Sequence, residues 1–300
     1  MKILLVVNKT YRNKPDSAFW YLFLPLKKLG HEIYWYDTVS PDNPDFDKII
    51  DSFKPDLIFC CLTGDRNITP FEPWEQIQAQ TQKGNIKTFN WFCDDTWRFN
   101  NFSSKVCDLF TVCSTPEPSF INKFKEIGYD NIILGCWHAN CDFYPRLDFQ
   151  DKDIPLSFIG FPTKSRQRFF ETCDLPIKNL YGLNQEELFH THSKSKIGIN
   201  LSVNDNDPEK KTQMKQRMFE IPAGQGLLVT EHHDGIEHFF EIDKEVVTFK
   251  CTEELEKKVK FLLKKPKILK TLALNGHRRF TNEHDSTKRL EKVLKDIQRV

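Results

Sequence analysis

Apolar residues in the first half of the chain form short runs that alternate with amphipathic segments. Lys2 to Val7 is a β-rich run, and after a polar stretch Ser17 to Leu29 has the spacing of an amphipathic helix, which Gly30 ends. The alternation predicts further strands and helices as far as Leu134: strands at 31–36, 56–62, 86–92, 109–113 and 132–134, and helices at 46–53 and 117–127. Strands that alternate with helices indicate a parallel sheet covered on both faces.

A charge-rich stretch that contains proline, from Tyr144 to Ile154, interrupts this pattern and is the expected linker. A second α/β series follows it: strands at 156–159, 197–201, 226–230 and 245–249, helices at 166–172, 214–220, 252–263 and 266–275, and a polar helix at 285–300. The pattern predicts two doubly wound domains that face each other across a cleft. We expect boundaries at 1–150 and 151–283, with residues 284–300 returning toward the first domain. Ligands of such sheets bind beyond the carboxyl ends of the strands.

Charge and cysteine usage narrow the function classes. The 300 residues include 43 basic and 42 acidic side chains, so no overall field favours nucleic acid or an anionic membrane, although a local patch stays open. The opening MKILLVV is too short for a signal peptide or a membrane span. Nine cysteines without a CxxC pair fit reduced thiols. We therefore expect a cytoplasmic protein that has no membrane span and for which nucleic acid is not the expected partner.

The segment QRMFEIPAGQGLLVT places Arg217 and Glu220 shortly before two glycines, Gly224 and Gly226. Further blocks follow it in order: EHFFEIDKEVVTF, EELEKKVKFLL and GHRRFTNEHDSTKR. Over roughly residues 156–295 these blocks resemble the C-terminal half of the CgeB-like (spore-maturation type) group 1 glycosyltransferases. That resemblance implies a GT-B fold of two Rossmann-like domains and an enzyme that uses a nucleotide-sugar donor.

By the same resemblance, Glu220 holds the ribose hydroxyls of the donor and Arg217 binds its diphosphate. An ionised carboxylate accepts hydrogen bonds from a vicinal diol, and a guanidinium matches phosphate oxygens. Gly224 and Gly226 would let the backbone approach the nucleotide closely. Taken alone, an arginine and a glutamate three residues apart can also simply pair on a helix surface.

The segment SFIGFPTKSRQRFF predicts a second part of the donor site. Gly160 ends an apolar strand, and Lys164 and Arg166 come just before or within the next helix. A helix N-terminus adds hydrogen-bond donors and positive potential, so this order of elements commonly receives a diphosphate. The family resemblance favours Arg166, with Lys164 as its neighbour; ordinary solvated basic residues are the alternative.

Two positions depart from the pattern of the related retaining enzymes. Where those enzymes carry a second glutamate, eight positions before Glu220, this chain has Thr212, and Gln225 replaces a glycine. Asp207 and Glu209 are close enough in sequence to substitute, although their segment also fits a solvated turn. The stereochemical outcome of the transfer therefore stays open.

In the first half, TFNWFCDDTWRF ends an apolar strand on Asp94 and Asp95. Either carboxylate suits the deprotonation or orientation of an acceptor hydroxyl, and Trp97 suits stacking on a sugar ring or a base. The alternative for the two aspartates is an Asx turn that caps the next segment. The later WHANCDFYP resembles the passage that ends the first domain in these enzymes, which makes His138 an expected interdomain residue on the acceptor side.

The sequence thus predicts a metal-independent glycosyltransferase without a cofactor. Its expected donor is a nucleotide sugar, with UDP as the nucleotide, and its expected acceptor is a glycan or another hydroxyl compound. Two alternatives remain: a non-catalytic nucleotide- or glycan-binding protein on the same scaffold, and a glycosyltransferase that modifies a DNA base. Several histidines are closely spaced, but no carboxylate or thiol completes a metal set.

Overall fold

The computed structural model describes residues 1–11, 13–203, 205, 207 and 209–300. This part of the chain divides into two compact units. Unit 1 contains Met1–Cys136 and Arg289–Val300, and unit 2 contains Trp137–Lys288. In the described residues, no helix is long and apolar enough to cross a membrane.

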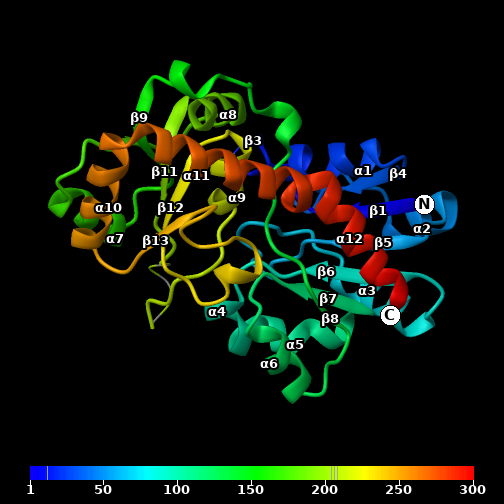
Figure 1. The fold of residues 1–300 in the computed structure, drawn as a ribbon. Coiled ribbons are helices and arrows are strands. Elements are labelled where there is room, and N and C mark those ends of the chain that lie inside the picture. The colour runs from blue at the N-terminus through cyan, green and yellow to red at the C-terminus, as the bar shows by residue number, and fades with distance from the viewer. Residues whose placement is uncertain (12, 204, 206, 208) are drawn as a thin grey trace. The chain divides into compact units, whose positions relative to one another are not determined.

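Unit 1 is built on a parallel sheet, which has six strands among its described residues, in the order β4-β1-β5-β6-β7-β8 (Figure 1). The strands are β1 (Lys2–Val6), β4 (Glu32–Tyr36), β5 (Leu57–Cys60), β6 (Lys87–Trp91), β7 (Val112–Thr115) and β8 (Ile132–Leu134). The helices are α1 (Leu24–Lys28), α2 (Phe46–Phe53), α3 (Trp74–Lys83), α4 (Asp95–Arg98), α5 (Ser104–Val106) and α6 (Phe120–Glu126). A short antiparallel pair, β2 (Thr10–Tyr11) and β3 (Lys14–Pro15), follows β1.

Successive residues of β1 enter two different apolar clusters, because side chains alternate between the faces of a strand. Leu4 and Val6 join a cluster that α2, α3 and α6 complete. Ile3 and Leu5 join the other cluster, which α1 and the C-terminal helix α12 (Ser286–Arg299) complete. Both faces of the sheet are therefore covered, as a parallel sheet requires.

Unit 2 contains a second parallel sheet, with the order β10-β9-β11-β12-β13 over its described residues. The strands are β9 (Ile154–Ile159), β10 (Lys178–Leu180), β11 (Ser195–Asn200), β12 (Leu227–Glu231) and β13 (Val247–Phe249). The helices that begin in this unit are α7 (Lys164–Thr172), α8 (Gln185–Lys194), α9 (Arg217–Ala223), α10 (Thr252–Lys264), α11 (Pro266–Arg279) and α12.

Helices cover both faces of this sheet as well. Apolar side chains from α7, α10 and α11 pack with those of β9, β11, β12 and β13 in one cluster. On the other face, α9 lies so close to β11 that a Cβ atom on Gly198 would come 2.6 Å from the Ile221 side chain. The neighbouring helix α8 begins with a capping box in which Asn184 and Glu187 each bind the other's backbone N–H.

Residues 137–150 pack with unit 2. The Phe143 ring stacks on Phe189 of α8, and Phe149 lies in the apolar cluster of the sheet. The C-terminal helix belongs to both units: residues 286–288 lie in unit 2, whereas Leu290 and Ile297 lie in an apolar cluster of unit 1. In unit 1 the Lys87 ammonium also donates to the backbone carbonyl of Ile297, at 3.1 Å.

The structure confirms the predicted α/β class with two doubly wound, Rossmann-like sheets. Strand β8 and helix α2 have the predicted bounds, and β4 begins one residue later than expected. Helices α3 and α8 and the edge strand β10 were not predicted.

Candidate functional site

Four candidate residues of unit 2 lie at the edge of its sheet where the parallel strands end: Gly160, Lys164, Arg166 and Arg217. β9 ends at Ile159, β11 at Asn200 and β12 at Glu231. The chain leaves β9 through Gly160 and enters α7 at Lys164, so the N-terminus of α7 lies at the same edge. Topology alone thus makes this edge the expected ligand site of the sheet.

Arg217 opens α9 and points back across this edge. Its Nε donates to the carbonyl of Ile159, and its NH1 donates to Oδ1 of Asn200 at 2.8 Å. Its guanidinium lies 4.6 Å from the centroid of the Phe158 ring. Burial, with the nearby Arg166 charge second, lowers the pKa of Arg217 to about 9. The side chain is therefore still a cation at neutral pH, and an incoming anion would stabilise its charge.

Arg166 approaches the same aromatic ring from α7. Its NH1 donates to the carbonyl of Phe161 at 2.9 Å and its NH2 to that of Leu201 at 3.2 Å, and its guanidinium lies 5.4 Å from the Phe158 centroid. Burial lowers its pKa too, although Glu231 and Asp205 oppose the shift. Among the described residues, neither arginine forms an ion pair with a carboxylate. Within the described part of the chain, two like charges therefore meet without a paired anion.

Glu231, at the end of β12, raises the pKa of both arginines, although Glu220 has the larger effect on Arg217. Oε2 of Glu231 accepts hydrogen bonds from the backbone N–H of Ser202, from Oγ of Ser202 at 3.2 Å and from the N–H of Val203 at 3.2 Å. These bonds hold it on the loop after β11. Glu231 raises the pKa of both arginines, but it forms its hydrogen bonds with the loop and not with either guanidinium.

Glu220 lies one helical turn after Arg217 and is 8% exposed. Its Oε2 lies 3.9 Å from Nε2 of His192 on α8. Burial, followed by the charges of Arg217 and Lys152, lowers the pKa of His192 to about 3, so this histidine is neutral. The Glu220 carboxyl thus faces a neutral imidazole, on the buried face of α9.

The remaining candidates of unit 2 divide between the two edges of the sheet. Lys164 is exposed at the first turn of α7, near Arg166. Gly224 and Gly226 lie where α9 ends and β12 begins, at the opposite edge. A Cβ atom on Gly224 would come 2.7 Å from the His192 backbone, and one on Gly226 would come 3.1 Å from the carbonyl oxygen of Ser195. The structure therefore does not bring these two glycines together with the arginines.

His138 is buried in unit 2. Its Nδ1 lies 2.8 Å from Oγ of Ser286, and its carbonyl accepts from the Gln216 side chain at 2.9 Å. Next to it, Ala139 and Asp285 form a parallel bridge. His138 thus links the segment that opens unit 2 to the start of α12 and to the residue before Arg217.

Thr212 occupies the position of the missing glutamate. Its Oγ1 lies 3.3 Å from Nδ1 of His233. Of the two neighbouring carboxylates, Asp207 accepts from the N–H of Glu209 at 2.9 Å, and Glu209 pairs with Lys211. In the described residues, no group of three histidine, cysteine or carboxylate side chains is arranged to hold a metal.

In unit 1, Asp94 and Asp95 follow β6, but their environments differ. Asp94 precedes α4 and is partly exposed, and its carbonyl accepts from the N–H groups of Trp97 and Arg98. Asp95 is 0% exposed. Burial raises its pKa to about 7, with smaller increases from Glu117 and Asp94, while the hydroxyls of Ser103 and Thr115 lower it. Trp97 lies on α4 with the Arg98 guanidinium 5.7 Å from its ring.

Comparison with known proteins adds a family to this geometry. Residues 152–295 match the sequence model of a family described as "Glycosyl transferase-like". The matched residues cover most of unit 2. No curated protein sequence matches the chain at a significant level.

Solved structures of glycosyltransferases share the whole fold. Alr3699/HepE from Anabaena, in complex with UDP and glucose, is 9% identical, with a TM-score of 0.68 and 100% of both chains covered. A glycosyltransferase from Rickettsia africae is 12% identical, with a TM-score of 0.65 and coverage of 99% of this chain and 98% of that one. An α-glucosyltransferase in complex with UDP and mismatched DNA is 12% identical, with a TM-score of 0.66 and 99% of each chain covered. The fold is GT-B, and the family match with this fold indicates a glycosyltransferase enzyme.

The sequence pattern did not single out three residues of the candidate site: Phe158, Asn200 and Glu231. Each lies at or next to the carboxyl end of a strand that the sequence did predict. A polar residue that ends an apolar strand was a usable signal for Asn200 and Glu231. Phe158 gave no such signal, because it is indistinguishable in sequence from an ordinary core residue.

Proposed function

We propose that this chain transfers a sugar from a UDP-sugar donor to a hydroxyl acceptor without a bound metal or cofactor. The observation that carries the proposal is the pair of guanidiniums of Arg166 and Arg217 over one Phe158 ring, without a carboxylate ion pair in the described residues. The fold is shared with HepE, whose structure was solved in complex with UDP-glucose. The reaction would take place in the cytoplasm, where cysteines stay reduced.

The donor diphosphate is the anion that best fits this cluster. Two desolvated arginines repel each other, and each has its pKa lowered by burial. A diphosphate between them would offset both their mutual repulsion and the cost of burying their charges. It would also accept charge-assisted hydrogen bonds from the guanidiniums. The exposed Lys164 and the N-terminus of α7, where the N–H of Ser165 donates to Asp205, would add positive potential. These groups would stabilise the leaving diphosphate, which is the task that a metal performs in other enzymes.

Glu220 is the proposed partner of the donor ribose. Its carboxylate offers acceptor positions for two neighbouring hydroxyls, and His192, being neutral, does not neutralise it. Arg217 and Glu220 lie on one helix, so α9 would set the distance between the diphosphate site and the ribose site. A helix fixes such a distance better than a loop does.

We assign the acceptor side of the reaction to Asp94 of unit 1. In the transfer, the bond between the anomeric carbon and the diphosphate oxygen breaks, and a bond to the acceptor oxygen forms. The acceptor proton passes to a base, and we propose the partly exposed Asp94 as that base. Asp95 is fully buried, so we propose it as a positioning residue behind Asp94. Trp97 would stack on the acceptor ring.

Within the glycosyltransferases we propose the CgeB-like subtype, on the order of the sequence blocks from Arg217 to Arg289. Thr212 and its contact with His233 replace the second glutamate of the retaining relatives. The stereochemistry of the product, measured by NMR of the anomeric proton, would show whether the enzyme still retains the configuration.

Binding and turnover with a panel of UDP-, GDP- and ADP-sugars test the proposal. We expect calorimetric binding of UDP and slow hydrolysis of a UDP-sugar in the absence of acceptor. Turnover should persist after treatment with a chelator. Failure to bind any nucleotide would overturn the proposal, and strict dependence on a divalent cation would overturn its metal-independent form.

Thr212 also favours a second candidate, a binding protein on the same scaffold that has lost transfer activity. Such a protein would bind UDP as tightly as an active glycosyltransferase does. It would neither hydrolyse a UDP-sugar nor transfer the sugar to glycans, small hydroxyl compounds or DNA. DNA is included among the tested acceptors because one protein with a similar fold was solved in complex with DNA.

A further inference from the structure

The corner between α10 and α11 concentrates positive charge. We call residues 257–270 the α10–α11 corner. This segment, KKVKFLLKKPKILK, contains seven lysines and no acidic residue, although the net charge of the whole chain is +1. The corner would therefore attract an anionic partner through a local positive field, which the net charge of the whole chain does not indicate.

Most of these lysines have no counterion among the residues that the structure describes. Lys258 pairs with Glu254 at 2.7 Å, and Lys260 pairs with Asp174 at 3.2 Å and with Glu256 at 3.4 Å. The other five form no ion pair with any described residue: Lys257, Lys264, Lys265, Lys267 and Lys270. The turn itself, residues 264–268, is exposed at every position. The charge is thus uncompensated and accessible.

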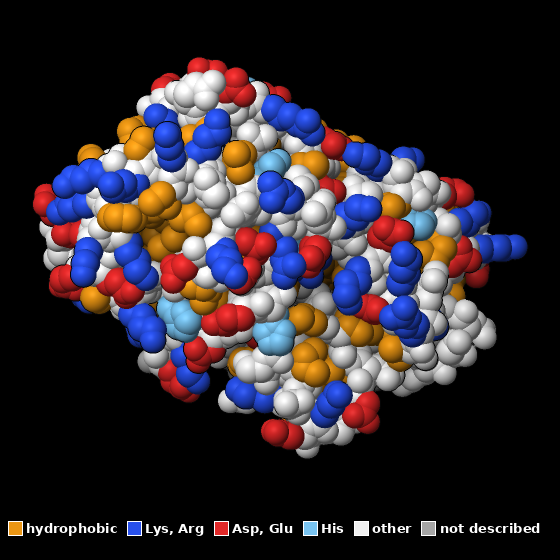
Figure 2. Space-filling view, viewed as in Figure 1, with side chains coloured by type: hydrophobic (Ala, Val, Ile, Leu, Met, Phe, Trp, Pro, Cys, Tyr) orange, Lys and Arg blue, Asp and Glu red, His pale blue; other side chains and the backbone are white. Residues whose placement is uncertain are grey.

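Apolar side chains lie among the lysines. Phe261 is 51% exposed and Ile268 is 44% exposed. Both line a cavity of about 270 Å³, together with Leu272, Lys258 and the acidic Asp243. Figure 2 shows apolar side chains gathered beside lysines over α10 and α11. Exposed aromatic and branched side chains ringed by lysines are typical of a surface that inserts shallowly into an interface.

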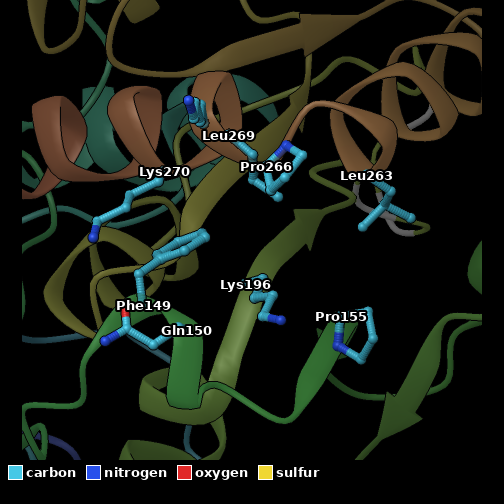
Figure 3. Close-up of a pocket in the computed structure, with 9 residues that line it drawn as sticks. Phe149, Gln150, Pro155, Lys196, Leu263, Pro266, Leu269 and Lys270 are labelled. Carbon is cyan, nitrogen blue, oxygen red and sulfur yellow. The ribbon is translucent and has the colours of Figure 1, made fainter.

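A second cavity, of about 390 Å³, lies beside the first turn of α11. Lysine ends and an apolar floor line it. Figure 3 shows the Phe149 ring between Lys270 of α11 and Lys196 of β11. Lys267 borders both this cavity and a shallow one beside Ile268. The cavity would seat one phosphate head with part of its hydrocarbon, as a continuation of the corner.

The corner lies away from the proposed donor site in unit 2. The second cavity contains Pro155 and Lys196, which lie at the amino ends of β9 and β11, whereas Arg166 and Arg217 lie at the carboxyl edge. A partner bound at the corner would therefore leave the donor site open.

We infer that the α10–α11 corner docks unit 2 onto an anionic lipid bilayer. Acidic headgroups attract clustered lysines, and Phe261 and Ile268 would enter the boundary between headgroups and acyl chains. Nucleic acid is the competing polyanion. The exposed apolar tips and the absence of arginine from residues 257–270 favour lipid, because arginine is the preferred partner of nucleic-acid phosphates.

Vesicle sedimentation of the full chain tests this inference. The protein should sediment with phosphatidylcholine vesicles that contain phosphatidylglycerol, should stay in solution with pure phosphatidylcholine, and should dissociate as salt is raised to about 0.5 M. Replacing Lys264, Lys265, Lys267 and Lys270 with Gln should weaken binding about tenfold or more. F261S/I268S should weaken binding as well, while leaving its salt dependence in place.

A matched variant controls for net charge. K48Q/K83Q/K105Q/K125Q removes four exposed lysines of unit 1 and should bind vesicles within about twofold of the unchanged protein. UDP affinity should be the same in all variants, so a failure of this inference is separate from a failure of the proposed function. Equal losses in both lysine variants, no binding to anionic vesicles, or tighter binding to duplex DNA that competes with vesicles would each overturn it.

Discussion

Gly160 and Arg217 use the same space at the carboxyl edge of the unit 2 sheet. A Cβ atom on residue 160 would lie 2.5 Å from NH2 of Arg217 and 2.9 Å from the Phe158 ring. Any side chain at this position must therefore displace the guanidinium or the ring beneath it. Arg217 can hold this position only because residue 160 has no side chain, whether or not the Gly160 backbone contacts a ligand.

Gly160→Ala should weaken UDP binding about tenfold, which corresponds to about 1.4 kcal/mol, because it moves the Arg217 guanidinium. Arg217→Ala should weaken binding by roughly 1.5 to 3 kcal/mol, the range for a hydrogen bond to a charged group. Calorimetric titration with UDP measures both changes.

The double variant distinguishes a shared cause from two separate ones. If Gly160 acts through Arg217, adding Gly160→Ala to Arg217→Ala should change UDP affinity by less than about twofold. Full additivity of the two losses would show that the glycine matters for another reason, such as direct contact with the nucleotide.

Arg166→Ala should also weaken UDP binding by roughly 1.5 to 3 kcal/mol, because this arginine supplies the second cation over Phe158. Arg168 lies on the same helix and is exposed, which makes Arg168→Ala the matched control with an expected change below about 0.5 kcal/mol. Equal effects of the two variants would mean that general positive charge, and not the position of Arg166, attracts the nucleotide.

Glu220→Ala should weaken UDP binding by about 1.5 to 3 kcal/mol, and Glu220→Gln should lose less, because the amide keeps one acceptor oxygen. Uracil and uridine, which lack the diphosphate, separate the contributions: binding of uridine should fall with Glu220→Ala, and that of uracil should not. Glu186→Ala on the exposed face of α8 is the control. Unchanged affinity for UDP and uridine would leave Glu220 a structural partner of His192.

The sequence predicted the sheets well because β strands in a buried parallel sheet are continuous apolar runs. β5, whose four residues are all buried, lies within the predicted strand 56–62 for this reason. The sequence did not predict α3, which follows Pro73. Its segment WEQIQAQTQK is mostly polar, so its apolar stripe is weak. The sequence also did not predict β10, a short edge strand in which two of three residues are exposed. Elements that bury little apolar surface leave little periodicity to detect.

The candidate site was predicted in part. The sequence named Arg166 and Arg217 separately, but their meeting over one ring depends on the pairing of β9 with β11, which local pattern does not encode. It grouped Gly224 and Gly226 with the site because they follow Glu220 closely. Since α9 runs from one edge of the sheet to the other, seven helical residues were enough to carry them to the opposite edge.

Asp95 should make stability depend on pH in an unusual direction. Burial raises its pKa to about 7 in the folded protein from an unfolded value of 3.8. Between these values the folded state holds a proton that the unfolded state has lost, so stability falls as pH rises through this window and is level above it. The slope is at most about 1.4 kcal/mol per pH unit.

Asp95→Asn, which carries no charge to desolvate, should remove this dependence. Melting temperatures of the variant and the unchanged protein should be similar near pH 4 and should diverge, in favour of the variant, up to about pH 7. A constant difference at all pH values would show that Asp95 does not titrate in this window.

Asp94→Asn separates catalysis from donor binding. If Asp94 takes the acceptor proton, its amide variant should bind UDP normally, since the proposed donor site lies wholly in unit 2, and should lose transfer by roughly 10²- to 10⁴-fold. If Asp94 has no part in the transfer, the variant should keep its turnover per folded molecule, and no loss of a helix cap is expected, because the Asp94 side chain makes no capping hydrogen bond to α4. Asp95→Asn is the matched comparison, because it changes the same group one residue away without facing solvent. We expect that variant to keep UDP affinity and to change transfer by less than Asp94→Asn, so a larger loss in Asp95→Asn would reverse the two assignments.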